Sequence, residues 1–178
     1  MTDFSLSYSV FKDLADRKKG FWQCVDLGNR YEVLLIPGAY QYELIESWLD
    51  DFGKSAISGD YERHWLRETY ASHTHGAFYA GRLAVAEFLE RIRRQAAVLI
   101  VREIFPEYNI PVGIWQLREA VRGAFSRPYE KFDNLLQAVN RICGRVAVRG
   151  KWTTKSILLK NLRQQSTIKT FLKTKPPE

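Results

Sequence analysis

The sequence predicts an α+β domain in which a hairpin and a central strand form a mixed or antiparallel sheet, helices pack on that sheet, and the C-terminal part is helical. Three patterns predict this class. Two aromatic and β-branched runs flank a Gly-Asn pair, a β-branched run stands near the middle of the chain, and several segments repeat apolar residues every three or four positions. With 178 residues, of which 46% are hydrophobic, the chain is long enough for one folded core.

A β-hairpin is predicted at the start of the sheet, over residues 21–27 (FWQCVDL) and 30–36 (RYEVLLI). The junction at Gly28-Asn29 suits a two-residue turn with positive φ. Pro37 then ends the second strand.

A helix is predicted over residues 40–52, closed by Gly53. Acidic residues separate its apolar positions, which recur at helical spacing: Leu44, Ile45, Trp48, Leu49 and Phe52. Residues 53–63 are expected to form a polar loop, and the segment 64–76 has no clear pattern.

The middle of the chain predicts a helix, a buried strand and a second helix. The helix begins at Ala77, and the β-branched residues of 96–104 favour a strand buried on both faces. A loop, PEYNIP, separates that strand from a helix over 114–125.

The last third predicts further helices. One is expected to open at Pro128 and YEKFD, followed by a short strand over 145–149 (RVAVR) and a final helix over about 153–163. We therefore predict one domain over 1–162 and a flexible basic tail over 163–178.

Charge is distributed unevenly along the chain. Residues 1–90 contain 9 Lys and Arg against 14 Asp and Glu, whereas residues 91–178 contain 18 against 6, within a formal net charge of +7. A basic half of this kind is typical of a surface that binds nucleic acid or another polyanion. A solvated basic surface without a partner is the alternative.

The sequence argues against several classes of protein. No apolar run approaches the roughly 18 residues of a membrane span, and the N-terminus lacks the order of regions found in a signal peptide. Cys24 and Cys143 are too few for a disulfide framework or a cysteine zinc site. We therefore expect a cytoplasmic protein without a membrane partner.

Residues 114–149 run as helix, short turn, helix and short strand, with basic side chains throughout. This order is compatible with a winged-helix DNA reader, and an ordinary helical pair with solvated arginines is the favoured alternative. Both allow phosphate contacts. With two arginines from upstream, the predicted nucleic-acid-binding residues are Arg93, Arg94, Arg118, Arg122, Arg127, Lys131, Arg145 and Arg149.

The case for a catalytic metal site is weak. Its candidate ligands are His64, His73, His75, Glu103, Glu107 and Glu119. No third ligand stands at a metal-binding spacing from the His-x-His pair, and no HExxH, Walker or Gly-x-Ser-x-Gly motif occurs. We predict no metal and no cofactor, and histidines that lie in loops or cap a helix.

The C-terminal tail carries the most specific motif. Residues 165–172 (QSTIKTFL) resemble the PCNA-interacting peptide, with which replication and repair proteins dock on the sliding clamp. One 3₁₀ turn would bring Ile168 and Phe171 to the same side as an apolar plug. Gln165 would hydrogen-bond the clamp surface, and Leu172 stands where that peptide usually has a second aromatic residue.

A longer resemblance covers the middle of the chain. Residues 76–125, from GAFYAGRLAVAEFLERIRR to QLREAVRGAF, resemble the C-terminal domain of the archaeal Nre family of DNA-repair proteins. Residues 29–49 look like its strand-Pro-Gly-helix segment, and residues 152–172 look like its closing helix and clamp-binding tail. Many family members are longer and carry an N-terminal four-cysteine zinc motif that this sequence lacks. The resemblance therefore implies a split or shortened member whose missing N-terminal half is a separate polypeptide, or an orphan with an altered function.

Together these features predict a DNA-repair-associated protein that docks on the sliding clamp through its tail and binds nucleic acid through a basic surface. Two alternatives remain open at this point. One is a metal-dependent nucleic-acid phosphodiesterase that uses acids such as Glu103 and Glu107. The other is a structural subunit that completes a split partner protein.

Overall fold

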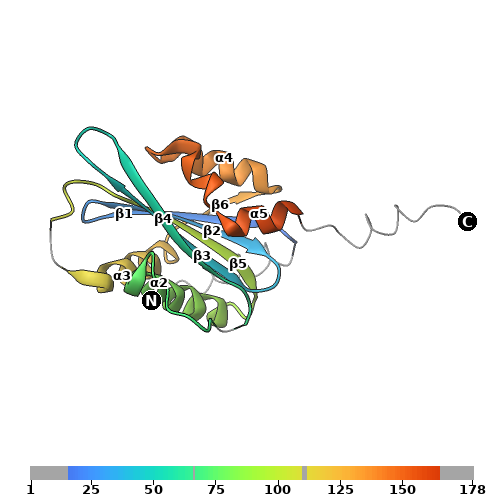
Figure 1. Cartoon of the computed structure of the whole chain (residues 1–178). Helices are drawn as coiled ribbons and strands as arrows, with labels where there is room; N and C mark the ends of the chain where they lie inside the picture. The colour runs from blue at the N-terminus through green and yellow to red at the C-terminus, as the bar shows by residue number, and fades with distance from the viewer. Residues whose placement is uncertain (1–15, 66, 110–111, 165–178) are drawn as a thin grey trace, which may run out of the picture.

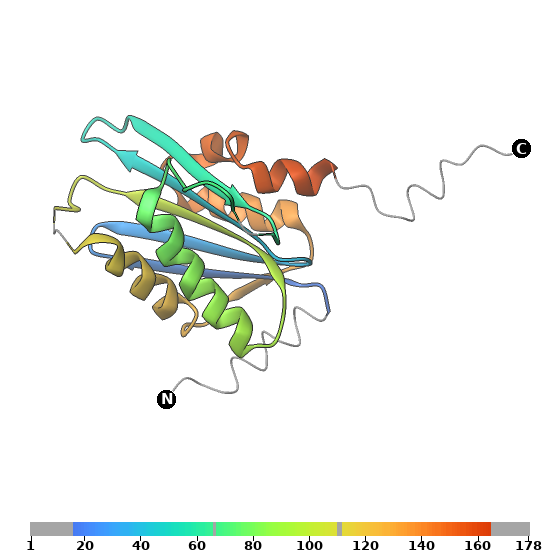
Figure 2. The ribbon, with the colours of Figure 1, turned by 60° about the horizontal axis from the view of Figure 1, so that its bottom comes forward.

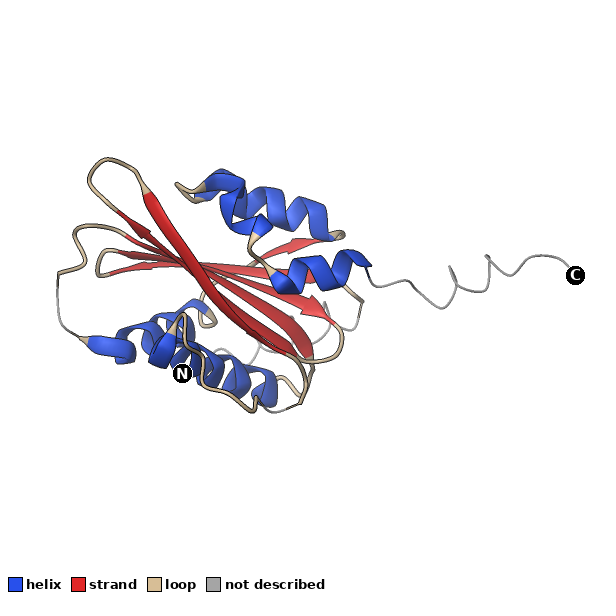
Figure 3. Cartoon of the chain, viewed as in Figure 1, coloured by secondary structure: helices blue, strands red, loops and turns tan. Residues whose placement is uncertain are grey.

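A computed structural model describes residues 16–65, 67–109 and 112–164, and these form a six-stranded sheet with helices on both faces (Figures 1 and 3). The strands are β1 (Lys19–Asp26), β2 (Asn29–Pro37), β3 (Gln41–Leu49), β4 (Ser55–Glu62), β5 (Ala96–Ile104) and β6 (Glu130–Phe132). The helices are α2 (His75–Arg91), α3 (Gly113–Ala124), α4 (Leu135–Arg145) and α5 (Ile157–Gln164), and a 3₁₀ helix, η1 (Arg149–Thr154), precedes α5.

The sheet is mixed, as expected. Its strand order is β4-β3-β5-β2-β1-β6, with β3 and β5 parallel and the other neighbours antiparallel. All nine residues of β5 are buried. Because α2 connects the β3–β4 hairpin back to β5, the most apolar strand of the chain comes to lie inside the sheet.

The two faces of the sheet carry separate cores. Successive side chains of a strand point to opposite faces, so β5 places Val98 and Ile100 in one core and Leu99 and Val101 in the other. Helices α2 and α3 cover the first face, where Figure 2 shows them side by side, and α4, η1 and α5 cover the second.

The predicted hairpin is confirmed, with its turn one residue earlier than expected. Asp26 pairs with Asn29, so the turn residues are Leu27 and Gly28, with φ angles of 44° and 69°. Two positive φ angles are typical of the turn that matches the twist of a hairpin. A Cβ at Gly28 would lie 2.8 Å from the backbone nitrogen of Tyr108, so this position also needs glycine for space.

The helix predicted over 40–52 is wrong: this segment forms β3, and the polar loop predicted over 53–63 contains β4. Leu44 and Ile45 are buried in opposite cores, as strand alternation requires. The misleading residues are Glu43 and Glu46, which suggest a solvated helix face but are both buried. Each has partners that come from elsewhere in the sequence, so tertiary contacts override the local pattern.

The helix predicted from Pro128 begins later, at Leu135. Residues 130–132 instead pair with β1 as the edge strand β6, and the Asn134 side chain caps α4 by accepting from the Gln137 N–H at 2.9 Å. The strand predicted over 145–149 is also wrong, because these described residues form the end of α4, a turn and the start of η1. Val146 and Val148 are both buried, which produces strand-like alternation without a strand.

The predictions from Ala77 to residue 125 agree with the structure: α2, β5 and α3 occupy the expected positions. The final helix is α5, and the first residues of the predicted helix belong to η1. Within the described ranges, none of the helices combines the length and apolar character that a membrane crossing would need.

Candidate nucleic-acid interface

A basic cleft lies between the edge strand β4 and the 3₁₀ helix η1, and we call it the lysine cleft. It has a volume of about 750 Å³ and is lined by Lys54, Ser55, Ile57, Lys151, Thr154 and Lys155. All three lysines are exposed, and none of them forms an ion pair with another described residue. The cleft therefore presents three free positive charges, and none of its described lining residues is acidic.

A buried tryptophan holds the η1 side of the cleft in place. Trp152 is fully buried in the second core, with Ile45, Leu158 and Leu159. Its carbonyl accepts from the backbone N–H groups of Lys155 and Ser156, at 3.0 and 3.2 Å. Since Trp152 points inward, its exposed neighbours on η1 face solvent and the cleft.

A buried glutamate of β3 fastens the following helix to the sheet. The Glu43 carboxylate accepts from the Ile157 N–H at 2.7 Å, from the Leu158 N–H at 3.3 Å, and from the Ser156 hydroxyl. Burial raises the pKa of Glu43, whereas the hydrogen bonds from Ser156 and the two N–H groups lower it. A carboxylate at the first turn of α5 also faces the positive end of the helix dipole. Glu43 thus fixes the start of α5, which follows η1 closely in sequence, against β3.

The β4 side of the cleft begins at an ordered turn. The Asp50 carboxylate accepts from the Phe52 N–H at 3.0 Å and the Lys54 N–H at 2.7 Å. Two backbone hydrogen bonds of 3.0 Å, from Gly53 to Asp50 and from Asp50 to Lys54, close the turn. The turn therefore places Lys54 at the mouth of the cleft.

The sequence holds one signal for this interface. Residues 134–177 contain ten Lys and Arg and no Asp or Glu, which covers all of η1 and α5. Arg149, one of the predicted nucleic-acid-binding residues, is the exposed first residue of η1. Lys54 had no such signal, because it lies in the acidic half of the chain, and only the fold brings it to η1.

The eight predicted nucleic-acid-binding residues do not share one face. Arg93 and Arg94 lie directly after α2, and Arg118 and Arg122 lie on α3. Arg145 and Arg149 belong to the end of α4 and to η1, on the opposite side of the sheet. Arg127 is exposed after α3, and Lys131 is exposed on β6.

Three of these arginines on the α2–α3 side already bind carboxylates. Arg122 donates to Glu87 at 2.6 and 2.7 Å and to Glu119 at 2.6 Å. The hydrogen bond from Arg122 lowers the pKa of Glu87. Arg118 also pairs with Glu119, at 3.1 Å, and Arg93 pairs with Glu90, at 3.1 Å. These acids reduce the positive potential that α2 and α3 offer to a phosphate.

Arg145 belongs to a cluster of charges that ties α4 to the sheet. Its Nε donates to Glu32 at 3.0 Å, and its carbonyl accepts from Arg30, which in turn pairs with Glu103 at 3.3 Å. Burial raises the pKa of Glu32 to about 7, and Arg145 opposes that shift. Burial also raises the pKa of Glu103. The role of Arg145 in this cluster is structural.

The acids proposed for a phosphodiesterase have different surroundings. Glu103 is fully buried, and its carboxylate also accepts from the Val148 N–H at 3.0 Å. Glu107 is exposed on the loop after β5. A substrate outside the protein could reach only Glu107, so the structure does not bring the two together as a catalytic pair.

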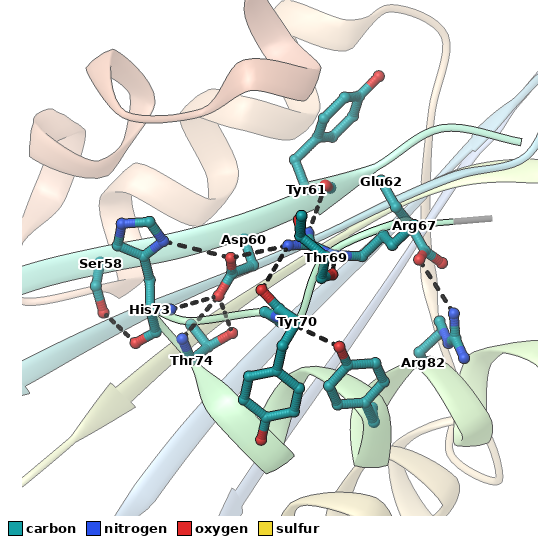
Figure 4. A network of polar contacts seen from close by, with 12 residues as sticks. Ser58, Asp60, Tyr61, Glu62, Arg67, Thr69, Tyr70, His73, Thr74 and Arg82 are labelled. Carbon is teal, nitrogen blue, oxygen red and sulfur yellow. Dashed lines mark hydrogen bonds and ion pairs between the residues drawn. The ribbon is translucent and has the colours of Figure 1, made fainter. Parts of the chain in front are cut away.

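One of the three histidines, His73, belongs to a network centred on Asp60 (Figure 4). The buried Asp60 carboxylate accepts from the backbone N–H groups of His73 and Thr74, at 3.0 and 2.7 Å, and from the Thr74 hydroxyl at 2.9 Å. Burial opposes ionisation, but these donors hold the pKa of Asp60 below its usual range. Arg67 is 3.6 Å from the same carboxylate and also donates to the Tyr61 carbonyl at 2.8 Å. The network fastens the segment before α2 to β4.

Among the residues that the structure describes, no three His, Cys, Asp or Glu side chains gather as metal ligands. The ring of His64 packs edge-on against Trp65, and His75 is the first residue of α2. Of the three histidines, all of which lie in the described ranges, only His73 hydrogen-bonds to the Asp60 network.

The winged-helix arrangement is wrong for residues 114–149. Helix α3 packs beside α2 in the first core, and α4 packs in the second core on the other side of the sheet. The two helices therefore form neither a helix-turn-helix unit nor the ordinary helical pair expected as its alternative.

The predicted clamp-binding residues Gln165, Ile168, Phe171 and Leu172 lie outside the described residues. Helix α5 continues through Gln164. The clamp-binding box and the domain boundary after residue 162 stay predictions.

Comparisons with known proteins point to one family. Residues 62–171 match the family model described as archaeal Nre, C-terminal. The chain is 37% identical to DNA repair protein NreB of Archaeoglobus fulgidus over 144 residues, which cover 78% of this chain and 37% of the relative. It is 40% identical to DNA repair protein NreA of the same organism over 121 residues, which cover 64% of this chain and 31% of the relative.

A third relative is DNA repair protein NreA of Haloferax volcanii, 33% identical over 155 residues that cover 83% of this chain and 35% of the relative. The chain thus spans about a third of the length of these relatives. No solved structure matches it. A separate partner for the rest of the relatives' length stays a prediction.

Proposed function

Because this chain belongs to the archaeal Nre family, we propose that it acts in DNA repair, binds nucleic acid in the lysine cleft and docks on the sliding clamp through its tail. The three relatives, each named a DNA repair protein, support the DNA-repair role. The observation that carries nucleic-acid binding is the cleft itself, where Lys54, Lys151 and Lys155 stand without ion-pair partners among the described residues. Phosphate groups are the natural ligands of such a set of cations.

Position and charge favour the cleft over the α2–α3 side. Exposed cations continue along η1, the short turn after it and α5 toward the C-terminus, as Arg149, Lys151, Lys155, Lys160 and Arg163. On α3, by contrast, Glu87 and Glu119 already pair with the arginines. A polyanion that approaches η1 releases counterions without breaking an existing ion pair.

The triple variant Lys54→Gln, Lys151→Gln, Lys155→Gln tests the cleft. We expect its affinity for a short fluorescent oligonucleotide to fall at least about tenfold at low salt. The slope of log affinity against log salt should decrease in magnitude by about 2 to 3, because each phosphate contact contributes roughly 0.9. Fluorescence anisotropy over a series of salt concentrations measures both quantities.

The matched control removes three cations from the other face, with Arg93→Gln, Arg118→Gln and Arg122→Gln. The slope of log affinity against log salt should be the same for this control as for the unmodified protein, within experimental error. If the triple arginine variant loses the salt dependence of binding and the triple lysine variant retains it, nucleic acid does not bind in the lysine cleft. Nucleic-acid binding itself is contradicted by a flat salt response of the unmodified chain.

The double variant Ile168→Ala, Phe171→Ala tests the tail. We expect it to weaken binding to the sliding clamp by more than about tenfold, because a central apolar pair dominates the energy of a small interface. Isothermal titration calorimetry with the purified clamp measures the affinity. Ser166→Ala with Thr167→Ala is the control within the same peptide and should bind as the unmodified chain does.

The two interactions are separable. The Ile168→Ala, Phe171→Ala variant should retain its oligonucleotide affinity, and the triple lysine variant should retain clamp binding. An unchanged affinity of the tail variant for the clamp would contradict docking through this peptide.

A further inference from the structure

Phe52 is the most exposed large hydrophobic side chain of the described residues, with 90% of its surface open to solvent. It lies in the turn between β3 and β4, two residues before Lys54 of the lysine cleft. It belongs to neither core. The fold therefore gives no packing reason for an aromatic ring at this position.

The turn holds the Phe52 backbone in a defined position. Its N–H donates to the Asp50 carboxylate at 3.0 Å, and the same carboxylate accepts from the Lys54 N–H at 2.7 Å. Gly53, with φ of 74°, closes the turn through its 3.0 Å hydrogen bond to the Asp50 carbonyl. A ring presented from an ordered turn loses little entropy when it stacks on a ligand.

The charges around the ring differ from those of the cleft. Asp50 and Asp51 lie in the turn, so phosphates are repelled from the immediate neighbourhood of Phe52. Lys54, Lys151 and Lys155 attract them a short distance along the same surface. This order, with an aromatic ring beside a row of cations, matches the alternation of base and phosphate along a single strand.

Resting on the function proposed above, we propose that the lysine cleft and Phe52 together bind single-stranded nucleic acid, with Phe52 stacked on an unpaired base. The lysines hold the phosphates that flank this base. In a duplex the bases are already stacked and paired, so the ring finds no base face there. Selection of single strands therefore comes from Phe52, and general affinity from the lysines.

Phe52→Ala in the full chain is the decisive variant. We expect its affinity for an unstructured oligothymidine to fall at least about fivefold, the lower end of what one stacked base contributes. Its affinity for a blunt-ended duplex of two separate strands with the same total number of phosphates should stay within about twofold. Fluorescence anisotropy at one fixed salt concentration measures both ligands.

Phe52→Trp adds a direct readout of stacking. It should retain the affinity of the unmodified chain for oligothymidine, and the additional indole fluorescence should be quenched by that ligand and not by the duplex. Tyr70→Ala removes another exposed aromatic ring, one that stacks on Tyr79 of α2 on the other side of the sheet. This control should bind both ligands as the unmodified chain does.

The outcomes separate this inference from the function on which it rests. If Phe52→Ala leaves oligothymidine affinity unchanged, or weakens both ligands equally, Phe52 does not stack on a base. The triple lysine variant would still report phosphate binding in that case. If the unmodified chain binds neither ligand, nucleic-acid binding in the cleft fails as a whole.

Discussion

Replacing Glu46 with Leu is expected to lower the free energy of unfolding by about 3–5 kcal/mol, because Arg102 would remain buried without its counter-charge. Glu46 of β3 and Arg102 of β5 are both buried, and Arg102 Nη1 donates to the Glu46 carboxylate at 2.6 Å. Burial raises the pKa of Glu46, and Arg102 opposes that shift. Urea unfolding followed by circular dichroism measures the change.

The surroundings of Arg102 explain why water cannot compensate for its charge when the Glu46 carboxylate is removed. Arg102 Nε donates to the Asn29 side chain at 2.9 Å, and its guanidinium lies 5.7 Å from the ring centroid of Tyr31 and 5.6 Å from that of Tyr108. Asn29 and the two rings hold the guanidinium in place but carry no negative charge. Loss of Glu46 therefore leaves a desolvated cation in the first core.

Two controls isolate the charge. The double variant Glu46→Leu, Arg102→Met removes both charges and should recover most of the lost stability, since apolar groups of similar size can replace a buried ion pair. Glu90→Gln breaks the exposed pair with Arg93, whose side chains are 67% and 80% exposed, and should cost less than about 1 kcal/mol. Equal losses in Glu46→Leu and Glu90→Gln would show that burial of the pair is irrelevant.

Replacing Trp152 with Ala is the second large change, with an expected loss of about 3–5 kcal/mol of stability. Trp152 is among the largest fully buried side chains, and the second core has no other tryptophan in the described residues. Its truncation leaves a cavity beneath η1. Trp152→Phe keeps part of the ring and should lose clearly less.

The Trp152→Ala variant also tests whether packing in the second core supports ligand binding in the lysine cleft. Trp152 holds η1, which carries Lys151, and its carbonyl accepts from the N–H of Lys155 directly after η1, so the variant should lose oligonucleotide affinity even under conditions where it is fully folded. Trp22→Ala is the matched control, because Trp22 is equally buried but lies in the first core, against Phe88, Phe125 and Tyr129. We expect comparable destabilisation by Trp22→Ala with unchanged affinity. Unchanged affinity of Trp152→Ala would separate the ordering of η1 from ligand binding.

Elements with a strong local pattern were predictable. The β1–β2 hairpin, β5, α2 and α3 follow from apolar periodicity, β-branched residues and a turn that needs positive φ. These signals act within a few residues, so distant contacts do not alter them. The family resemblance also depends on residues close together in sequence, and the comparisons confirm it.

The elements that were missed depend on distant partners. Glu43 and Glu46 give β3 the sequence pattern of an amphipathic helix. They can be buried in a strand because their hydrogen-bond partners belong to α5 and β5. Residues 130–132 become β6 only because β1 offers an unpaired edge. The spacing of apolar residues within a segment gives no information about partners that are distant in sequence.

The candidate site shows the same division. Residue type and short-range spacing are sufficient to predict the class of fold, the family, and the stretch of chain that carries excess positive charge. Which cations remain available to a ligand depends instead on the folded arrangement of the chain. It neutralises Arg122 with Glu87 and Arg145 with Glu32, and it brings Lys54 from the acidic half to the acid-free helix η1. A cation is free or paired according to the acids that folding places beside it, and those acids come from distant parts of the chain.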